Sequence, residues 1–202
     1  YVVNAENKTY SSENGILYKS GAVAAYPANG AVSEDGTVTL TAVPAQYAYY
    51  NNKNIKKVIL ANTITEIPEY AFYGSAVEEI IVSGSLKTIG NYAFASSGLK
   101  KFTIQLGENE KSKLETIGQR SFLDCVQLTS FEIPTSVKKI DSYAFAGAGL
   151  TSVTIPVNDE NSIASFNYST FANNLQLASV TLPDSMTSIC NSMFMGCESL
   201  KS

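Results

Sequence analysis

Apolar residues along this chain follow a spacing that fits neither a single amphipathic helix nor a single strand. In Leu128–Gly149 they fall at positions 1, 4, 6, 10, 13, 17 and 18 of the stretch. A helix repeats its apolar positions about every 3.6 residues, and a half-buried strand repeats them at every second residue. The opening Leu-x-x-Phe-x-Ile is typical of a short strand, so the stretch is predicted to be a strand followed by a turn.

A phenylalanine recurs at the same place of this pattern along the chain. Each one follows an apolar residue by five positions, from Ile67 before Phe72 to Ile189 before Phe194. The six marker residues are Phe72, Phe94, Phe122, Phe145, Phe171 and Phe194. They divide the chain into the coils 55–76, 77–98, 99–127, 128–149, 150–176 and 177–199. Extra residues fall at only two points of the coil, which is where a repeat structure tolerates longer loops.

One such coil cannot bury its own apolar side, so the coils are expected to stack. Stacking places equivalent residues on one another at the strand spacing of about 4.8 Å. It predicts a column of phenylalanine side chains on the convex side of the core. Segments such as Ser142–Gly147 leave room for about one turn, so only short helical or 3-10 turns are expected there.

The pattern L-x-x-V-x-I-P-x-x-V-x-x-I-x-x-x-A-F-x-G-C/A-x-x-L resembles the BspA-like leucine-rich repeat family of bacterial surface proteins. The resemblance extends over residues 55–200, with Ser121, Thr170 and Met193 replacing the alanine before the phenylalanine. Repeat and resemblance together predict a leucine-rich repeat solenoid, a right-handed superhelix that is mostly β, with one parallel sheet on its concave side. The resemblance also implies a secreted or surface-anchored module for adhesion or recognition, without catalytic residues.

Residues 1–54 are less regular and are predicted to form irregular N-terminal coils. Two short strand patterns separated by turn residues predict a β-hairpin excursion at about 10–27. A small independent N-terminal domain is the alternative. Residues 55–202 hold the six regular coils and the start of another.

Strand positions 3 and 5 of each coil are predicted to point away from the core, on the concave face. In the first three coils they are Lys57, Ile59, Glu79, Ile81, Lys101 and Thr103, which together form our candidate binding site. The alternating charges form either a recognition stripe or, as we favour, a cross-strand charge ladder. The two isoleucines indicate a contact surface, although β-propensity explains them equally well. In later coils the same positions hold Ser152, Thr154, Ser179 and Thr181.

Two further groups are candidates for ligand contacts. Tyr47, Tyr49 and Tyr50 either fill phenylalanine and alanine sites of a terminal coil, which we favour, or form a stacking platform for a sugar. Asp159 and Glu160 lie in a long loop, but their spacing does not match the D-x-[DN]-x-[DN]-G calcium loop. A solvated loop is therefore the favoured interpretation for these two acidic residues.

Composition narrows the range of partners. Charged residues make up 16% of the chain and the net charge is −4, so the basic stripe needed for nucleic acid is lacking. No apolar run reaches the roughly 18 residues of a membrane span, so membrane insertion is not expected. Ser, Thr, Asn and Tyr must carry the surface, as suits an extracellular protein. No signal peptide is visible, and we expect the sequence to be part of a longer chain.

The chain offers little for catalysis or for holding a cofactor. It has no histidine, which removes the usual Ser or Cys triads, and no glycine-rich phosphate loop. Glu79 and Glu132 are predicted to lie two strands apart, about 10 Å, too wide for a glycosidase pair. Three cysteines without histidine leave no plausible zinc site, and no cofactor is expected.

The three cysteines are predicted to be free thiols. Cys125 and Cys197 occupy the same site in coils three apart, which implies a separation of about 14 Å. A disulfide requires Cα atoms within roughly 4.4–6.8 Å. A turn separates Cys190 from Cys197, so we expect these thiols to pack as small apolar groups.

Two non-enzymatic functions follow from these observations. The first is an extracellular or cell-surface recognition module, an adhesin or receptor, that binds a host or matrix protein or a glycan through its concave face. The second is a rigid spacer that projects another domain from the cell surface. In either case we expect a monomer.

Overall fold

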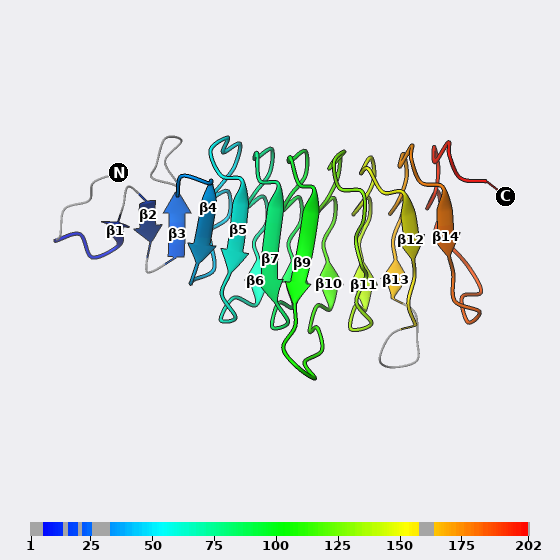
Figure 1. Cartoon of the computed structure of the whole chain (residues 1–202), viewed down its shortest axis with the longest axis horizontal. Helices are drawn as coiled ribbons and strands as arrows, with labels where there is room; N and C mark the ends of the chain where they lie inside the picture. Colours follow the sequence, from blue (N-terminus) through cyan, green and yellow to red (C-terminus); the bar gives the residue numbers. More distant parts are fainter. Residues whose placement is uncertain (1–5, 14–15, 20–21, 26–32, 158–163, 202) are drawn as a thin grey trace.

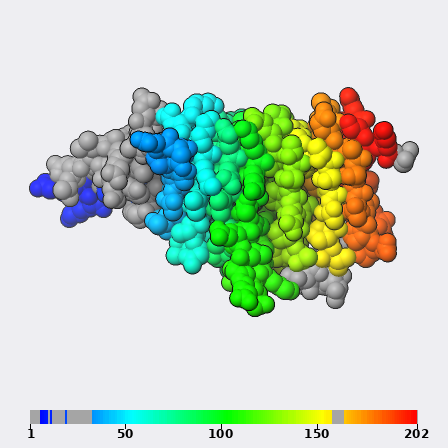
Figure 2. All heavy atoms as spheres, in the orientation of Figure 1, coloured from blue at the N-terminus to red at the C-terminus, as the bar shows by residue number. Residues whose placement is uncertain are grey.

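A computed structural model describes residues 6–13, 16–19, 22–25, 33–157 and 164–201. Figure 1 shows an elongated stack of coils that runs from the N-terminal strands at one end to the last coil at the other. Figure 2 shows the coils as successive bands along the long axis, with the loop after residue 105 projecting from the body. This architecture confirms the predicted solenoid.

The strands that open the coils pair in parallel. The first sheet has the order β4 (Thr37–Leu40), β5 (Lys57–Leu60), β7 (Glu79–Ser83) and β9 (Lys101–Gln105). Two later coils contribute β12 (Ser152–Thr154) and β14 (Ser179–Thr181), which form a second parallel sheet. The solvent-facing surface of the first sheet is where the candidate binding residues lie.

A second ladder of short parallel strands lies further along each coil. It consists of β6 (Glu66–Ile67), β8 (Thr88–Ile89), β10 (Thr116–Ile117), β11 (Lys139–Ile140) and β13 (Ser165–Phe166). The second residue of each strand points inward, and Ile89, Ile117 and Ile140 are fully buried. Each coil is therefore hydrogen-bonded to its neighbour on two sides.

A compact turn closes each coil around its aromatic residue. The backbone N–H of Phe72 donates to Ala93 of the next coil at 2.8 Å, and equivalent bonds recur along the stack. Each turn contains residues with positive φ, such as Tyr70 at 56° and Gly74 at 61°. A left-handed residue interrupts a right-handed helix. The described residues accordingly form no helix, and turns replace the short helical segments that we expected.

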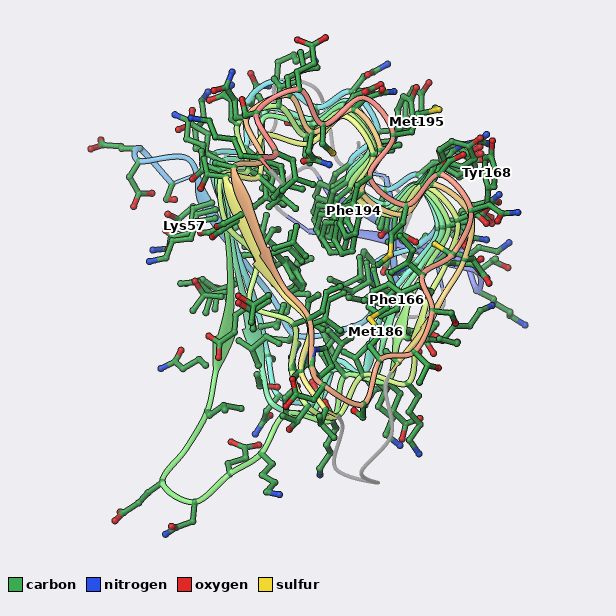
Figure 3. All side chains as sticks on the ribbon, turned by 90° about the vertical axis from the view of Figure 1, so that its right-hand side faces the viewer. Lys57, Phe166, Tyr168, Met186, Phe194 and Met195 are labelled. Atoms are coloured by element: carbon green, nitrogen blue, oxygen red, sulfur yellow. The ribbon has the colours of Figure 1, made fainter. Side chains whose placement is uncertain are left out.

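The marker phenylalanines stack as one column through the core, as predicted. Ring centroids of successive members are 4.9–5.8 Å apart and their planes are within 13° of parallel. The members are Tyr49, Phe72, Phe94, Phe122, Phe145, Phe171 and Phe194. Figure 3, a view along the stack, shows Phe194 inside the ring of the coil. Offset-parallel aromatic rings at this spacing attract one another beyond their burial.

The first break in regularity lies in the fourth coil. The strand predicted for its opening segment, residues 128–133, does not form, and this segment separates β9 from β12. Phe102 and Phe131 take the same inward position in neighbouring coils, with ring centroids 5.5 Å apart. Val58 and Ile80 fill this position in β5 and β7. The bulkier aromatic pair thus coincides with the place where strand pairing stops.

The second break lies in the last coil. Ile189 is 54% exposed, although the pattern assigns it to the core and its counterpart Ile89 is fully buried. No strand forms at Ile189, so the ladder of short strands ends at β13. Between β13 and this segment lies a cavity of about 320 Å³, whose lining includes Phe166, Met186 and Cys190. The last coil is therefore less tightly packed here.

The N-terminal strands run antiparallel. β1 (Tyr10–Glu13) pairs with β2 (Ile16–Lys19), and β3 (Ala22–Ala25) adds to β2. They form a three-stranded sheet, separate from the parallel sheets. The division of the chain at residue 54 into an irregular part and regular coils stays a prediction.

The cysteines are free thiols, as predicted. Cys125 is fully buried, and its Sγ lies 3.0 Å from the backbone oxygen of Phe94. Cys197 occupies the equivalent place in the last coil, 3.3 Å from the backbone oxygen of Phe171. Burial raises the pKa of the Cys125 thiol to about 12. This thiol therefore stays protonated at neutral pH and is a poor nucleophile.

Replacing Phe122 with alanine should lower the free energy of unfolding by about 3–5 kcal/mol, because it removes a fully buried ring and leaves a cavity. Urea denaturation followed by circular dichroism measures the change. Val126→Ala is the control, since Val126 is 67% exposed and should change stability by less than about 0.5 kcal/mol. A loss below about 1 kcal/mol for Phe122→Ala would contradict the stacked column.

Alkaline pH should destabilise the wild-type protein more than Cys125→Ala. Between the ordinary thiol pKa of 9.0 and about 12, the unfolded thiol loses its proton while the folded one keeps it. The folded state then binds more protons, so its stability falls as pH rises, by up to about 1.4 kcal/mol per pH unit. Urea unfolding at pH 8 and pH 10 should show this additional loss in wild type only. Equal losses in both proteins would show that the Cys125 thiol ionises normally.

Candidate functional site

The six candidate binding residues lie together on the outer face of β5, β7 and β9. The strand register aligns them in two rows, Lys57–Glu79–Lys101 and Ile59–Ile81–Thr103. The inward residues between the rows, Val58 and Ile80, are fully buried, which fixes the outward direction of their neighbours. The structure therefore brings all six residues onto one surface, which we call the sheet face.

One ion pair lies within the charged row and two more lie beside it. Lys57 Nζ lies 2.9 Å from Glu79 Oε2. Beside it, Glu78 bridges two lysines, at 2.7 Å from Lys100 Nζ and 3.0 Å from Lys56 Nζ. Hydrogen bonds from Lys100 and then Lys56 hold the pKa of the Glu78 carboxyl below its usual range. These contacts favour the cross-strand charge ladder over a row of free charges.

The second row presents apolar surface. Ile59 and Ile81 are neighbours in register and both are half-buried. Thr103 continues the row, and its Oγ1 is buried with no hydrogen-bond partner in the described part of the chain. Because this oxygen is buried, Thr103 does not offer its hydroxyl to a ligand at the surface. The row is therefore a short aliphatic strip beside the charge ladder.

The second sheet has a different surface. Ser152 pairs with Ser179 and Thr154 with Thr181, and all four side chains are exposed. This surface carries only small hydroxyl groups. Figure 1 shows that only short strands of the second ladder, such as β10 and β11, lie between β9 and β12. The sheet face is thus distinct in chemistry and in position from the surface of the later coils.

The tyrosine cluster of the first coils divides between core and surface. Tyr49 belongs to the buried column, in agreement with the favoured interpretation, whereas Tyr47 and Tyr50 are 49% and 46% exposed. Tyr47 stacks on Tyr70 of the next coil, with ring centroids 4.9 Å apart. The stack continues along the solenoid as a surface row that we call the tyrosine lane: Tyr47, Tyr70, Tyr92, Arg120, Tyr143 and Tyr168.

Sequence reasoning missed this lane. Its signal was a tyrosine two residues before the column residue in four coils, at Tyr47, Tyr70, Tyr92 and Tyr143. Figure 3 shows Lys57 of the sheet face and Tyr168 of the lane on opposite sides of the coil. The protein thus carries two separate candidate surfaces.

Neither surface has the features of a metal centre. Within the described ranges, no three His, Cys, Asp or Glu side chains lie close enough to hold a metal ion. Asp159 and Glu160, considered above for calcium, lie outside the described residues. The same described ranges contain no helix with the length and hydrophobicity of a membrane span.

Comparison with protein families gives one match. Residues 44–163 and 115–202 match the family described as BspA type leucine rich repeat region, in six copies. No curated protein matches the sequence significantly.

Solved structures of bacterial repeat proteins are similar to this chain. A leucine-rich repeat protein from Bacteroides ovatus has a TM-score of 0.55 and 21% identity, and covers 100% of this chain. This chain spans 46% of that protein's length. A leucine rich cell surface protein from Faecalibacterium prausnitzii has a TM-score of 0.45 and 14% identity, covering 98% of this chain and 83% of that one. The pneumococcal vaccine antigen PcpA has a TM-score of 0.44 and 18% identity, covering 82% and 55%.

Replacing Glu78 with glutamine should lower stability at pH 7 and have less effect in acid. The folded state depresses the Glu78 pKa, so its contribution is present above the ordinary value of 4.5 and is lost as pH falls through the folded pKa. Urea unfolding at pH 7 and pH 2.5 measures this, with exposed Glu66→Gln as the control. A difference between Glu78→Gln and wild type that is equal at both pH values would contradict the charge ladder.

Proposed function

Because the chain belongs to the BspA-type leucine-rich repeat family, we propose that it is a non-catalytic recognition or adhesion module of the bacterial surface. Proteins of this solenoid family are typically non-enzymatic. The absence of histidine from the sequence and its low charge content support the same conclusion. The proposal includes an extracellular or cell-surface location, which family membership supports.

The aliphatic strip carries this proposal. Binding energy at interfaces concentrates at apolar anchors surrounded by polar groups that exclude water. Ile59 and Ile81 are such anchors, and the ion pair of Lys57 with Glu79 borders them in the same strands. We therefore propose that Lys57, Ile59, Glu79, Ile81, Lys101 and Thr103 form the contact site.

The charge ladder supplies selectivity in this proposal. Lys57 pairs with Glu79, and the neighbouring Glu78 pairs with Lys56 and Lys100, so a partner meets alternating positive and negative groups rather than a single-sign field. Such a border disfavours partners that place like charges opposite it. Host or matrix proteins and glycans both fit this mixed surface, and the protein acts on them as a monomer.

A rigid spacer is the second candidate function. The aromatic column runs through the regular coils, and backbone hydrogen bonds join each coil to the next. Continuous nearest-neighbour contacts of this kind make a solenoid stiff along its axis. The plain hydroxyl surface of β12 and β14 also suits a segment that holds another domain away from the cell.

The double variant Ile59→Ser, Ile81→Ser should weaken binding at least tenfold, which corresponds to about 1.4 kcal/mol. The side chains lie outside the core, so the free energy of unfolding should stay within about 1 kcal/mol of wild type. Binding to immobilised host matrix proteins and to a glycan array identifies the ligand and measures the change.

The control is Thr154→Ser with Thr181→Ser, which alters the matching positions of the second sheet. It should leave both affinity and stability unchanged. Unchanged affinity of the isoleucine double variant, with an unchanged fold, would place the contact elsewhere. If wild type binds no member of the panel, the spacer becomes the better explanation.

A further inference from the structure

The tyrosine lane is built by the backbone of the turn. Tyr70, Tyr92, Arg120 and Tyr143 all have φ between 53° and 58°, in the left-handed region. Their backbone N–H groups donate to the next coil at 2.9–3.0 Å. Because Ser192 has the same conformation, the left-handed backbone belongs to the coil rather than to one ligand site. What varies between coils is the side chain that it presents.

Stacking fixes the rings of the lane, of which Tyr47 is 49% exposed and Tyr70 and Tyr92 are half-buried. Tyr47, Tyr70 and Tyr92 stack face to face at 4.9 and 4.8 Å. Their ring faces are therefore occupied by one another. What the lane offers a ligand is a row of phenolic hydroxyl groups, which can donate and accept hydrogen bonds, although that of Tyr92 already accepts one from Arg120. The row repeats at the pitch of the coils.

Arg120 interrupts the row with the only guanidinium of the chain. Its Cζ lies 5.5 Å from the ring centroid of Tyr92 and 5.0 Å from that of Tyr143. Its Nη1 donates to the hydroxyl of Tyr92. The two rings thus hold the guanidinium between them by cation–π contact.

Within the described ranges, no acidic side chain forms an ion pair with this guanidinium. Every ion pair between described residues is made by a lysine, and Arg120 takes part in none. Arginine carries five N–H donors in one plane. With both faces stacked and one donor bonded to Tyr92, the remaining in-plane donors suit a carboxylate bound in bidentate geometry.

From these two features we propose that the tyrosine lane binds an acidic polysaccharide, with a uronate carboxylate on Arg120 and sugar hydroxyls on the flanking tyrosines. The spacing of the lane favours a polysaccharide over a peptide. An extended peptide presents side chains to one side about every 6.6–6.8 Å, which does not match the spacing of about 5 Å between successive tyrosine rings of the lane. An extended chain of linked hexose rings, such as a polyuronate, repeats once per ring, close to the spacing between successive side chains of the lane. Hydroxyl-rich sugars also suit hydroxyl edges better than an apolar partner does.

This proposal does not depend on the sheet face. The lane lies on the opposite side of the coil from Lys57, as Figure 3 shows for Tyr168. A variant of the sheet face should therefore leave polysaccharide binding intact, and a lane variant should leave sheet-face binding intact.

The test uses polygalacturonate as the probe and its methyl-esterified form as the uncharged match. Wild type should bind polygalacturonate in calorimetry, and at least tenfold more tightly than the ester. Arg120→Gln should lose at least tenfold in affinity. Arg120→Lys should also weaken binding, because lysine keeps the charge but has no planar fork. Tyr70→Phe, which keeps the ring stack and removes one hydroxyl, should weaken it several-fold.

The charge-matched control is Lys87→Gln, which removes an exposed cation outside the lane and should leave affinity within twofold. Thermal melting confirms that each variant is folded. The proposal is wrong if wild type does not bind polygalacturonate, or if Arg120→Gln and Lys87→Gln lose affinity equally. Binding of polyglutamate with equal affinity and the same dependence on Arg120 would assign the lane to acidic peptides instead.

Discussion

Contact between successive coils is the constraint on which the whole structure depends. Backbone hydrogen bonds join each coil to the next on the sheet side and in the turns, and the buried aromatic rings stack between them. No coil closes a core alone, so stability arises from interfaces between neighbours. Phe122 illustrates this, because its ring is flanked by Phe94 and Phe145 and is fully buried.

The same contact sets the chemistry of the surface. Equivalent outward residues fall in rows at the pitch of the coils, so any residue type that recurs becomes a ladder. Lysine and glutamate produce the ion pairs of the sheet face, and tyrosine produces the lane on the other side. A single substitution within a row then creates a special position. Arg120 is such a position, because its neighbours in the row are aromatic rings that hold it.

The sequence was informative wherever one residue type marks one place in every coil. The phenylalanine marker predicted the solenoid and its column, and Tyr49 could be assigned to that column because it keeps the spacing. The marker says nothing about pairing between backbones, so the missing strand at 128–133 and the exposed Ile189 were not predicted. Left-handed residues inside the turns, which exclude helix there, also have no signature when the residue is tyrosine or serine.

The candidate surfaces show the same limit. Alternation along a strand was enough to place Ile59 and Ile81 outward and side by side. Alternation along a strand could not predict the tyrosine lane, because its residues lie in turns whose backbone conformation the sequence pattern does not define. Rigidity makes both surfaces selective, because side chains held at a fixed spacing by coil stacking cannot move to match a ligand that repeats at another spacing. A polymer whose units repeat at the spacing of the coils contacts the side chain that each coil presents, whereas a polymer of different spacing contacts few of them. The stiffness that suits a spacer therefore also favours recognition of a repeating polymer.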